Sequence, residues 1–221
     1  MRWYRSDAAR DFAVAANDGI IGTAGVLLGF AGAGASSTTL LVASLSALVA
    51  GSVAGFGAKY AELAAERDAE RALIAETALD IQEDASDDLD DLAAHFVERG
   101  VSHDLARDVA QQMHAHDAVG AQLEAEHGID RPMPRSRPVL GALGNAAALA
   151  TGSLLPLLML LAYPAAWEEW AVAAATLISL AVTSVLIALS ARTSVPRALR
   201  RTIGIGVATM GLSYLVGLVV F

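Results

Sequence analysis

A single carboxylate, Asp18, interrupts an apolar, glycine-rich run near the start of the chain, "AANDGIIGTAGV" at residues 15–26. No other residue from 12 to 58 is charged. An unpaired carboxylate in hydrocarbon costs several kcal/mol, so a charge kept there is a candidate for ion binding or proton transfer. Asp11 lies two helical turns earlier and shares its helix face. The spacing predicts a polar track into the segment; the alternative is a carboxylate that reaches water at the membrane edge or caps a helix break after Asn17.

Further carboxylates recur at helical spacing in the middle of the chain. They are Glu76, Asp80, Glu83, Asp84 and Asp87 in one series, Asp88 with Asp91 in a second, and Glu126 further on. Like charges on one helix face repel unless a cation shares them, and clustered oxygen ligands suit hard or borderline divalent cations. The alternative is a solvated acidic face. His114, His116 and Asp117 form a weaker candidate set, because helix neighbours two apart point in different directions.

The composition places these residues in a small integral membrane protein. The chain has 221 residues, is 55% hydrophobic and 18% charged, and its mean hydropathy is +0.48. It has no cysteine, which excludes disulfides, thiolate metal sites and thiol nucleophiles. Five stretches are long and apolar enough to cross a bilayer as helices. They lie near residues 13–33, 38–60, 139–163, 170–191 and 202–221. The sequence therefore predicts an all-α membrane protein with five transmembrane helices.

An acidic segment, residues 61–137, separates the second span from the third. It holds 19 Asp and Glu against 7 Lys and Arg, a net charge of −12, whereas the rest of the chain, with 5 acids and 8 bases, carries +3. It is rich in Ala, Glu and Leu, which favours helices, and Ser102 and Gly128 are a candidate cap and stop. We expect three parts: residues 1–60 with two spans, the helical insert 61–137, and residues 138–221 with three spans.

The arginines predict the orientation, because basic residues near span ends favour the cytoplasm. They precede span one and span three and lie between spans four and five: Arg2, Arg5, Arg10, Arg131, Arg135, Arg137, Arg192, Arg197, Arg200 and Arg201. With five spans, all three groups are cytoplasmic when the N-terminus and the insert are inside and Phe221 is outside. The charged N-terminus does not resemble a cleavable signal, so we expect the first span to be retained.

The order of these features resembles a known family. The most specific parts are the "DG" that opens span one, the "AGAS" of the following turn and the "RDAER" after span two. Together with "GNAAALATGSLLPLLMLLAY" and "RALRRTIGIGVATMGLSYLVG" they look like the vacuolar iron transporter family, which includes the yeast calcium-cross-complementer and nodulin-like proteins. The resemblance covers nearly the whole chain.

The resemblance implies a five-span homodimer that exports Fe²⁺ or Mn²⁺ from the cytosol in exchange for protons. The ion path would lie between the two copies of span one, with Asp18 as its intramembrane carboxylate and Asp11 at its cytoplasmic mouth. Glu76, Asp88, Asp91 and Glu126 fall where the family's insert binds metal. The metal is the substrate, no prosthetic group is implied, and the remaining expected partner is membrane lipid rather than nucleic acid. We expect a prokaryotic plasma membrane.

Several positions on this path and in the insert differ from the family pattern. Gly55 replaces a path-lining methionine, Lys59 replaces an acid, and Ala47 replaces a mid-span glutamate of some members; Gln122 and Leu123 replace two methionines near Glu126. These changes remove soft and anionic ligands. They favour a second hypothesis, a metal-sensing or scaffold membrane protein that does not transport. A membrane enzyme is the third and weakest hypothesis, because no catalytic spacing stands out.

Overall fold

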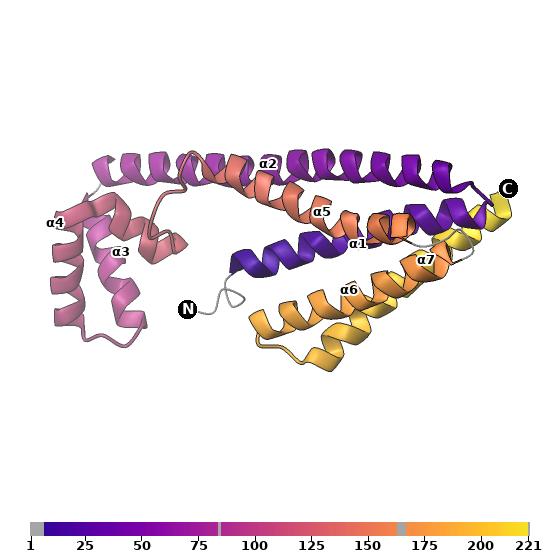
Figure 1. Cartoon of the computed structure of the whole chain (residues 1–221). Helices are drawn as coiled ribbons and strands as arrows, with labels where there is room; N and C mark the ends of the chain where they lie inside the picture. The colour runs from indigo at the N-terminus through magenta and orange to yellow at the C-terminus, as the bar shows by residue number, and fades with distance from the viewer. Residues whose placement is uncertain (1–6, 84, 163–166, 221) are drawn as a thin grey trace. The chain divides into compact units, whose positions relative to one another are not determined.

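The computed structural model describes residues 7–83, 85–162 and 167–220, which form α-helices and contain no strand. The seven helices of this part of the chain are α1 (Asp7–Gly32), α2 (Ser37–Glu83), α3 (Ala85–Glu98), α4 (His103–His127), α5 (Arg137–Ala162), α6 (Glu168–Ser190) and α7 (Val195–Val220) (Figure 1). Five of them, α1, α2, α5, α6 and α7, are long and apolar enough to cross a membrane. The predicted fold class and number of spans are therefore confirmed.

The membrane helices begin earlier than their uncharged stretches do. Helix α1 starts at Asp7 rather than near residue 13, and α7 starts at Val195 rather than near residue 202. In α7, Pro196 occupies the first turn, where a missing N–H costs nothing, and the Ser194 carbonyl accepts the N–H of Ala198 at 3.1 Å. Hydropathy marks the apolar part of a span, whereas hydrogen bonding sets where its helix begins.

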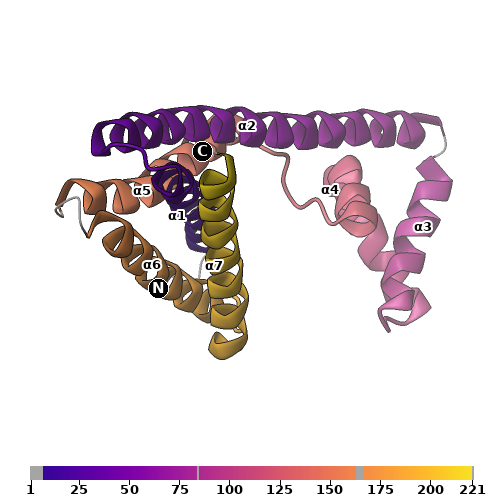
Figure 2. The ribbon, with the colours of Figure 1, turned by 90° about the vertical axis from the view of Figure 1, so that its right-hand side faces the viewer.

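The chain divides into two compact units, and the first comprises Met1–Tyr60 and Val139–Phe221. Its central element is α1, which packs against α6 and α7 and is surrounded by the other helices of this unit when viewed along its axis (Figure 2). The core includes Leu27 of α1, Leu160 of α5 and Val172 of α6. Helix α1 is the most deeply buried of the five spans, with 61% of its apolar window covered. Its sequence explains this position, because small residues let neighbouring helices approach closely.

A tight turn joins the first two membrane helices. Gly34 adopts a positive φ of 70°, a conformation that side chains other than glycine disfavour. Ser36 then caps α2, since its hydroxyl oxygen accepts the N–H of Thr39 at 3.3 Å. The polar residues of this turn supply the hydrogen bonds that the open helix ends need.

The second unit, Ala61–Pro138, contains the last part of α2 together with α3 and α4. Helices α3 and α4 pack around Leu92, Ala110 and Ala121, which are buried. Ser102 precedes α4 without a side-chain cap bond, and Gly128 ends the helix in the left-handed conformation, with its N–H bonded to the Glu124 carbonyl at 3.1 Å. The insert is thus a small helical unit with its own core.

Some residues used in the predictions lie outside the described part. Arg2 and Arg5, counted for the orientation, precede residue 7; Asp84, in the carboxylate series, falls in a gap; and Phe221 follows the last described residue.

Candidate functional site

Asp18 lies on an exposed side of α1, between two buried residues, Asn17 and Gly19. Successive helix residues point about 100° apart, so burial of both neighbours leaves the middle residue on the opposite side. Helix α1 runs without a break from Asp7 to Gly32. The alternative in which Asp18 caps a helix break after Asn17 is therefore wrong.

Asn17 ties α1 to α6. Its side chain is 7% exposed, and its Oδ1 accepts a hydrogen bond from the hydroxyl of Thr183. The Thr183 hydroxyl also lies 2.9 Å from the carbonyl oxygen of Ser179 on its own helix. An amide buried among apolar side chains needs a partner, and Thr183 supplies one across the helix interface.

Gly19 ties α1 to α5 in two ways. Its carbonyl oxygen accepts a hydrogen bond from the buried Ser153 hydroxyl at 3.2 Å. A Cβ at Gly19 would overlap the Leu149 carbonyl oxygen, and a Cβ at Gly152 would overlap the Ala16 carbonyl oxygen. The two backbones are in contact because each offers a glycine to the other. The neighbours of Asp18 are thus held by different helices, which fixes the rotation of α1 and turns the carboxylate outward.

Asp11 also lies on an exposed part of α1, where its Oδ1 is 3.7 Å from the guanidinium of Arg10. Val14 lies between the two carboxylates on this face and is also exposed. Gly22 lies one turn beyond Asp18, and an added Cβ there would touch nothing. The face therefore carries two carboxylates and is otherwise small and apolar.

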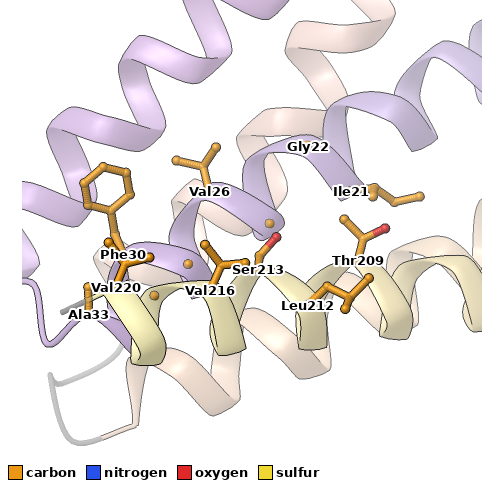
Figure 3. A pocket seen from close by; sticks show the side chains of 13 residues that line it. Ile21, Gly22, Val26, Phe30, Ala33, Thr209, Leu212, Ser213, Val216 and Val220 are labelled. Carbon is orange, nitrogen blue, oxygen red and sulfur yellow. The ribbon is translucent and has the colours of Figure 1, made fainter.

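Beyond Gly22, this face continues into an apolar groove between α1 and α7, with a volume of about 510 Å³ (Figure 3). Thr209 and Ser213 of α7 place the groove's two hydroxyl groups on the side that faces α1. The Ser213 hydroxyl would lie 3.3 Å from a Cβ at Gly25. Along α1 the exposed face thus passes from carboxylates at one end to an apolar, hydroxyl-bearing groove at the other.

Gly55 and Lys59, the other two predicted path residues, lie one turn apart on α2 and are both half-buried. The Gly55 carbonyl oxygen accepts a hydrogen bond from Nδ2 of Asn145 on α5 at 2.9 Å, and a Cβ at Gly55 would overlap Cδ1 of Leu149. Close packing of α2 on α5 therefore accounts for the glycine at this position. The path role of both residues stays a prediction.

The four predicted metal ligands of the insert lie on three helices: Glu76 on α2, Asp88 and Asp91 on α3, and Glu126 on α4. All except Asp88, which is half-buried, are exposed. Among the described residues, no three His, Asp or Glu side chains lie close enough to hold a metal ion. Glu126 accepts a hydrogen bond from Gln122 at 2.6 Å and lies 3.7 Å from the His127 ring. Their role as ligands stays a prediction.

Asp117, from the weaker histidine set, has a local structural role. It interrupts α4 with a non-helical φ of −156° and ψ of 90°, and its Oδ1 accepts the N–H of Gly120 at 3.0 Å. This is the bond by which an aspartate caps a helix, so the second half of α4 starts here. Helix α4 is therefore kinked at Asp117.

Three residues that orient Asp18 were not predicted from the sequence. They are Asn17 and Thr183, which bond to each other, and Ser153, which bonds to the Gly19 carbonyl. Each is a polar residue inside an otherwise apolar span, and that is the signal by which they are found. Polar side chains within membrane helices tend to face protein and to hydrogen-bond across helices. The partners themselves are far apart in sequence and become visible in three dimensions.

Two comparisons with known proteins bear on this arrangement. A family model described as the VIT family matches residues 9–218. A protein of Acanthamoeba castellanii named "Vacuolar iron transporter" is 31% identical over 165 residues, which cover 75% of this chain and 59% of that relative. The chain thus spans less than two thirds of that relative's length, and the matched family model includes α1 with Asp18.

Proposed function

Because the chain belongs to the VIT family, we propose that this integral membrane protein transports a divalent transition metal, Fe²⁺ or Mn²⁺, out of the cytosol in exchange for protons. The observation that carries the proposal is the outward-facing Asp18 between two buried residues that other helices hold in place. A carboxylate fixed in this way keeps its position while its charge state changes. The name of the Acanthamoeba relative supports iron as one substrate.

Charge balance gives the exchange a simple stoichiometry. We propose that two copies of the chain meet along the exposed face of α1, so that two Asp18 carboxylates face one path. Two carboxylates neutralise one divalent cation, and two protons neutralise the same two carboxylates. Exchange of one metal ion for two protons therefore leaves the path uncharged in both loaded states, which avoids the cost of a bare charge in the membrane.

The insert acts in this scheme as a cytoplasmic metal collector. Glu76, Asp88, Asp91 and Glu126 would bind the ion before it reaches Asp11 at the mouth of the path. Since these carboxylates lie on different helices and are mostly exposed, the incoming cation itself would draw them together.

The orientation remains the one that the arginines predict, with the N-terminus and the insert in the cytoplasm of a prokaryote and the C-terminus on the other side of its plasma membrane. Reporter fusions at Gly100 and after Phe221 should therefore report opposite compartments. Identical compartments would contradict a five-span path.

Uptake of Fe²⁺ or Mn²⁺ into proteoliposomes under a pH gradient tests the transport proposal. Asp18→Asn keeps the shape of the side chain but cannot change charge, so it should reduce metal-driven proton movement to the level of protein-free vesicles. Asp108→Asn, an exposed carboxylate on α4, is the matched control and should transport like the wild type. Full activity of Asp18→Asn would refute the carrier role.

The same assay separates transport from the sensor or scaffold alternative. A wild-type protein that binds metal but moves none would favour the alternative. Lys59→Glu restores the acid expected at this position of α2. Transport that appears in Lys59→Glu alone would mean that the lysine keeps the native path closed.

A further inference from the structure

A second candidate site lies within the acidic insert, and its lining includes none of the four predicted metal ligands. A groove of about 460 Å³ runs between residues 67–78 of α2 and the proline-rich segment 132–135. Its lining includes three arginines, Arg67, Arg71 and Arg135, in a unit whose net charge is −12. This concentration of cations is opposite in sign to its surroundings.

The proline-rich wall of the groove is fastened to α2 by one hydrogen bond. Pro132 and Pro134 have no N–H, so Met133 offers the one backbone donor of this triplet. The Met133 N–H is donated to Oε1 of Glu70 at 2.8 Å. Glu70, the acidic residue in the lining, is therefore engaged with the wall itself. Ile74 and Met133, both half-buried, provide an apolar floor.

Among the described residues, two arginines of this unit pair with an acidic side chain, and the three that line the groove do not. In this unit Arg107 lies 3.1 Å from Asp90, and Arg131 lies 3.7 Å from Asp130. Within the described part of the chain, Arg67, Arg71 and Arg135 form no ion pair. The Nε of Arg67 is also shielded from solvent and has no hydrogen-bond partner among the described residues. A buried donor without an acceptor is unfavourable, so an accepting ligand next to Arg67 would remove this cost.

We propose that this groove binds the phosphate group of an organic phosphate. Guanidinium groups form forked, charge-assisted hydrogen bonds to phosphate oxygens, and a phosphate can accept from several arginines at once. Arg67 and Arg71 would approach it from α2 and Arg135 from the opposite wall. The remaining volume and the floor of Ile74 and Met133 accommodate the organic part. The phosphate belongs either to a soluble phosphate ester or to an acidic lipid headgroup, and the two sources are separable by experiment.

The test uses the full-length protein in nanodiscs of phosphatidylcholine, titrated with glycerol phosphate in a calorimeter. Loss of one charge-assisted contact in Arg71→Gln should weaken binding roughly tenfold or more. Arg71 is exposed, so this variant is expected to fold. Arg99→Gln, an exposed arginine outside the groove, makes the same charge change and should bind as the wild type does.

The lipid source is tested by native mass spectrometry of protein taken from membranes that contain phosphatidylglycerol. Retention of this lipid by wild type and Arg99→Gln, but not by Arg71→Gln, assigns the groove to a headgroup. Calorimetric binding with the same pattern assigns it to a soluble ester. If neither probe distinguishes Arg71→Gln from Arg99→Gln, the proposal is overturned.

Two substitutions of Glu70 separate a built groove from general electrostatic attraction. Glu70→Gln removes a negative charge but keeps the oxygen that accepts the Met133 N–H. This variant should therefore bind the phosphate probe more tightly than the wild type does. Glu70→Ala removes the same charge and also releases the wall that carries Arg135, so it should bind several-fold more weakly than Glu70→Gln. Equal affinities would mean that charge alone acts and that the groove is not a site.

Discussion

The membrane unit and the acidic insert hold their polar side chains in opposite ways. In the membrane unit, neutral groups bridge different helices: Asn17 with Thr183, Ser153 with the Gly19 carbonyl, and Asn145 with the Gly55 carbonyl. In the insert, the charged side chains are mostly exposed, and pairs such as Arg107 with Asp90 lie at the surface. Water can satisfy a polar group in the insert, whereas a polar group in a membrane needs a protein partner. The position of the membrane carboxylate is therefore set by contacts between helices, whereas most carboxylates of the insert are exposed to solvent.

The largest effect on stability should come from filling the contact between α1 and α5. Gly152→Ala places a methyl group against the Ala16 carbonyl oxygen, so the two backbones must separate. Such overpacking costs about 1–3 kcal/mol. Thermal unfolding of the purified protein should show a clear drop in the melting temperature of this variant.

Gly144→Ala, on the same helix, is the matched control, because a Cβ there would meet nothing within 4 Å. It should be neutral or slightly stabilising, since alanine favours helix more than glycine does. Equal melting temperatures for the two variants would show that α5 does not lie against α1 as described.

A smaller effect is expected from the bridge between α1 and α6. Thr183→Val keeps the side-chain shape but leaves Asn17 Oδ1 without its donor. Hydrogen bonds between membrane helices contribute about 0.5–1.5 kcal/mol, so unfolding in a denaturing detergent should begin at a modestly lower detergent fraction. If α1 turns more freely, metal uptake should also fall while the amount of folded protein stays close to that of the wild type.

Thr151→Val makes the same change at an exposed threonine whose hydroxyl bonds to the Ala147 carbonyl of its own helix at 2.7 Å. It should leave both stability and uptake near wild-type values. A comparable loss of uptake in both variants would show that the Asn17 bridge has no particular role in orienting Asp18.

The contrast between the two units also explains which features can be predicted from the sequence and which cannot. Five spans follow from uncharged stretches, and the shared face of Asp11 and Asp18 follows from helical spacing. The bridge of Asn17 to Thr183 does not follow, because it joins residues 166 positions apart. The sequence shows that Gly55 lacks a ligand-type side chain, but it does not show that the glycine packs against Asn145 and Leu149 of α5.

In the insert, spacing places carboxylates on helix faces but cannot show whether the faces converge. Glu76, Asp91 and Glu126 belong to three different helices, and each side chain is exposed. Asp117 likewise carries a ligand-type side chain but accepts the N–H of Gly120 at a helix start. Residue type alone therefore does not distinguish a metal ligand from a cap or a solvated charge.

The smallest effect on stability without metal should come from substituting the predicted metal ligands of the insert. These substitutions also test most directly whether the insert differs from the membrane unit in how it holds its carboxylates. A variant with Glu76→Gln, Asp88→Asn, Asp91→Asn and Glu126→Gln keeps side-chain shape, and the new amide at 126 can still accept from Gln122. Without metal, each change at an exposed site should alter stability by less than about 0.5 kcal/mol. Relief of repulsion between like charges acts in the stabilising direction.

The difference should appear when metal is added. A ligand at one hundred times its dissociation constant stabilises the folded state by about 2.7 kcal/mol, so Mn²⁺ should raise the wild-type melting temperature. The four-site variant should lose this rise. A control with amides at Asp68, Glu98, Asp108 and Glu124, which are exposed carboxylates of the same helices, removes the same charge and should keep it. If both variants lose the rise equally, the acidic surface attracts cations through its net charge alone, and the four predicted ligands form no site.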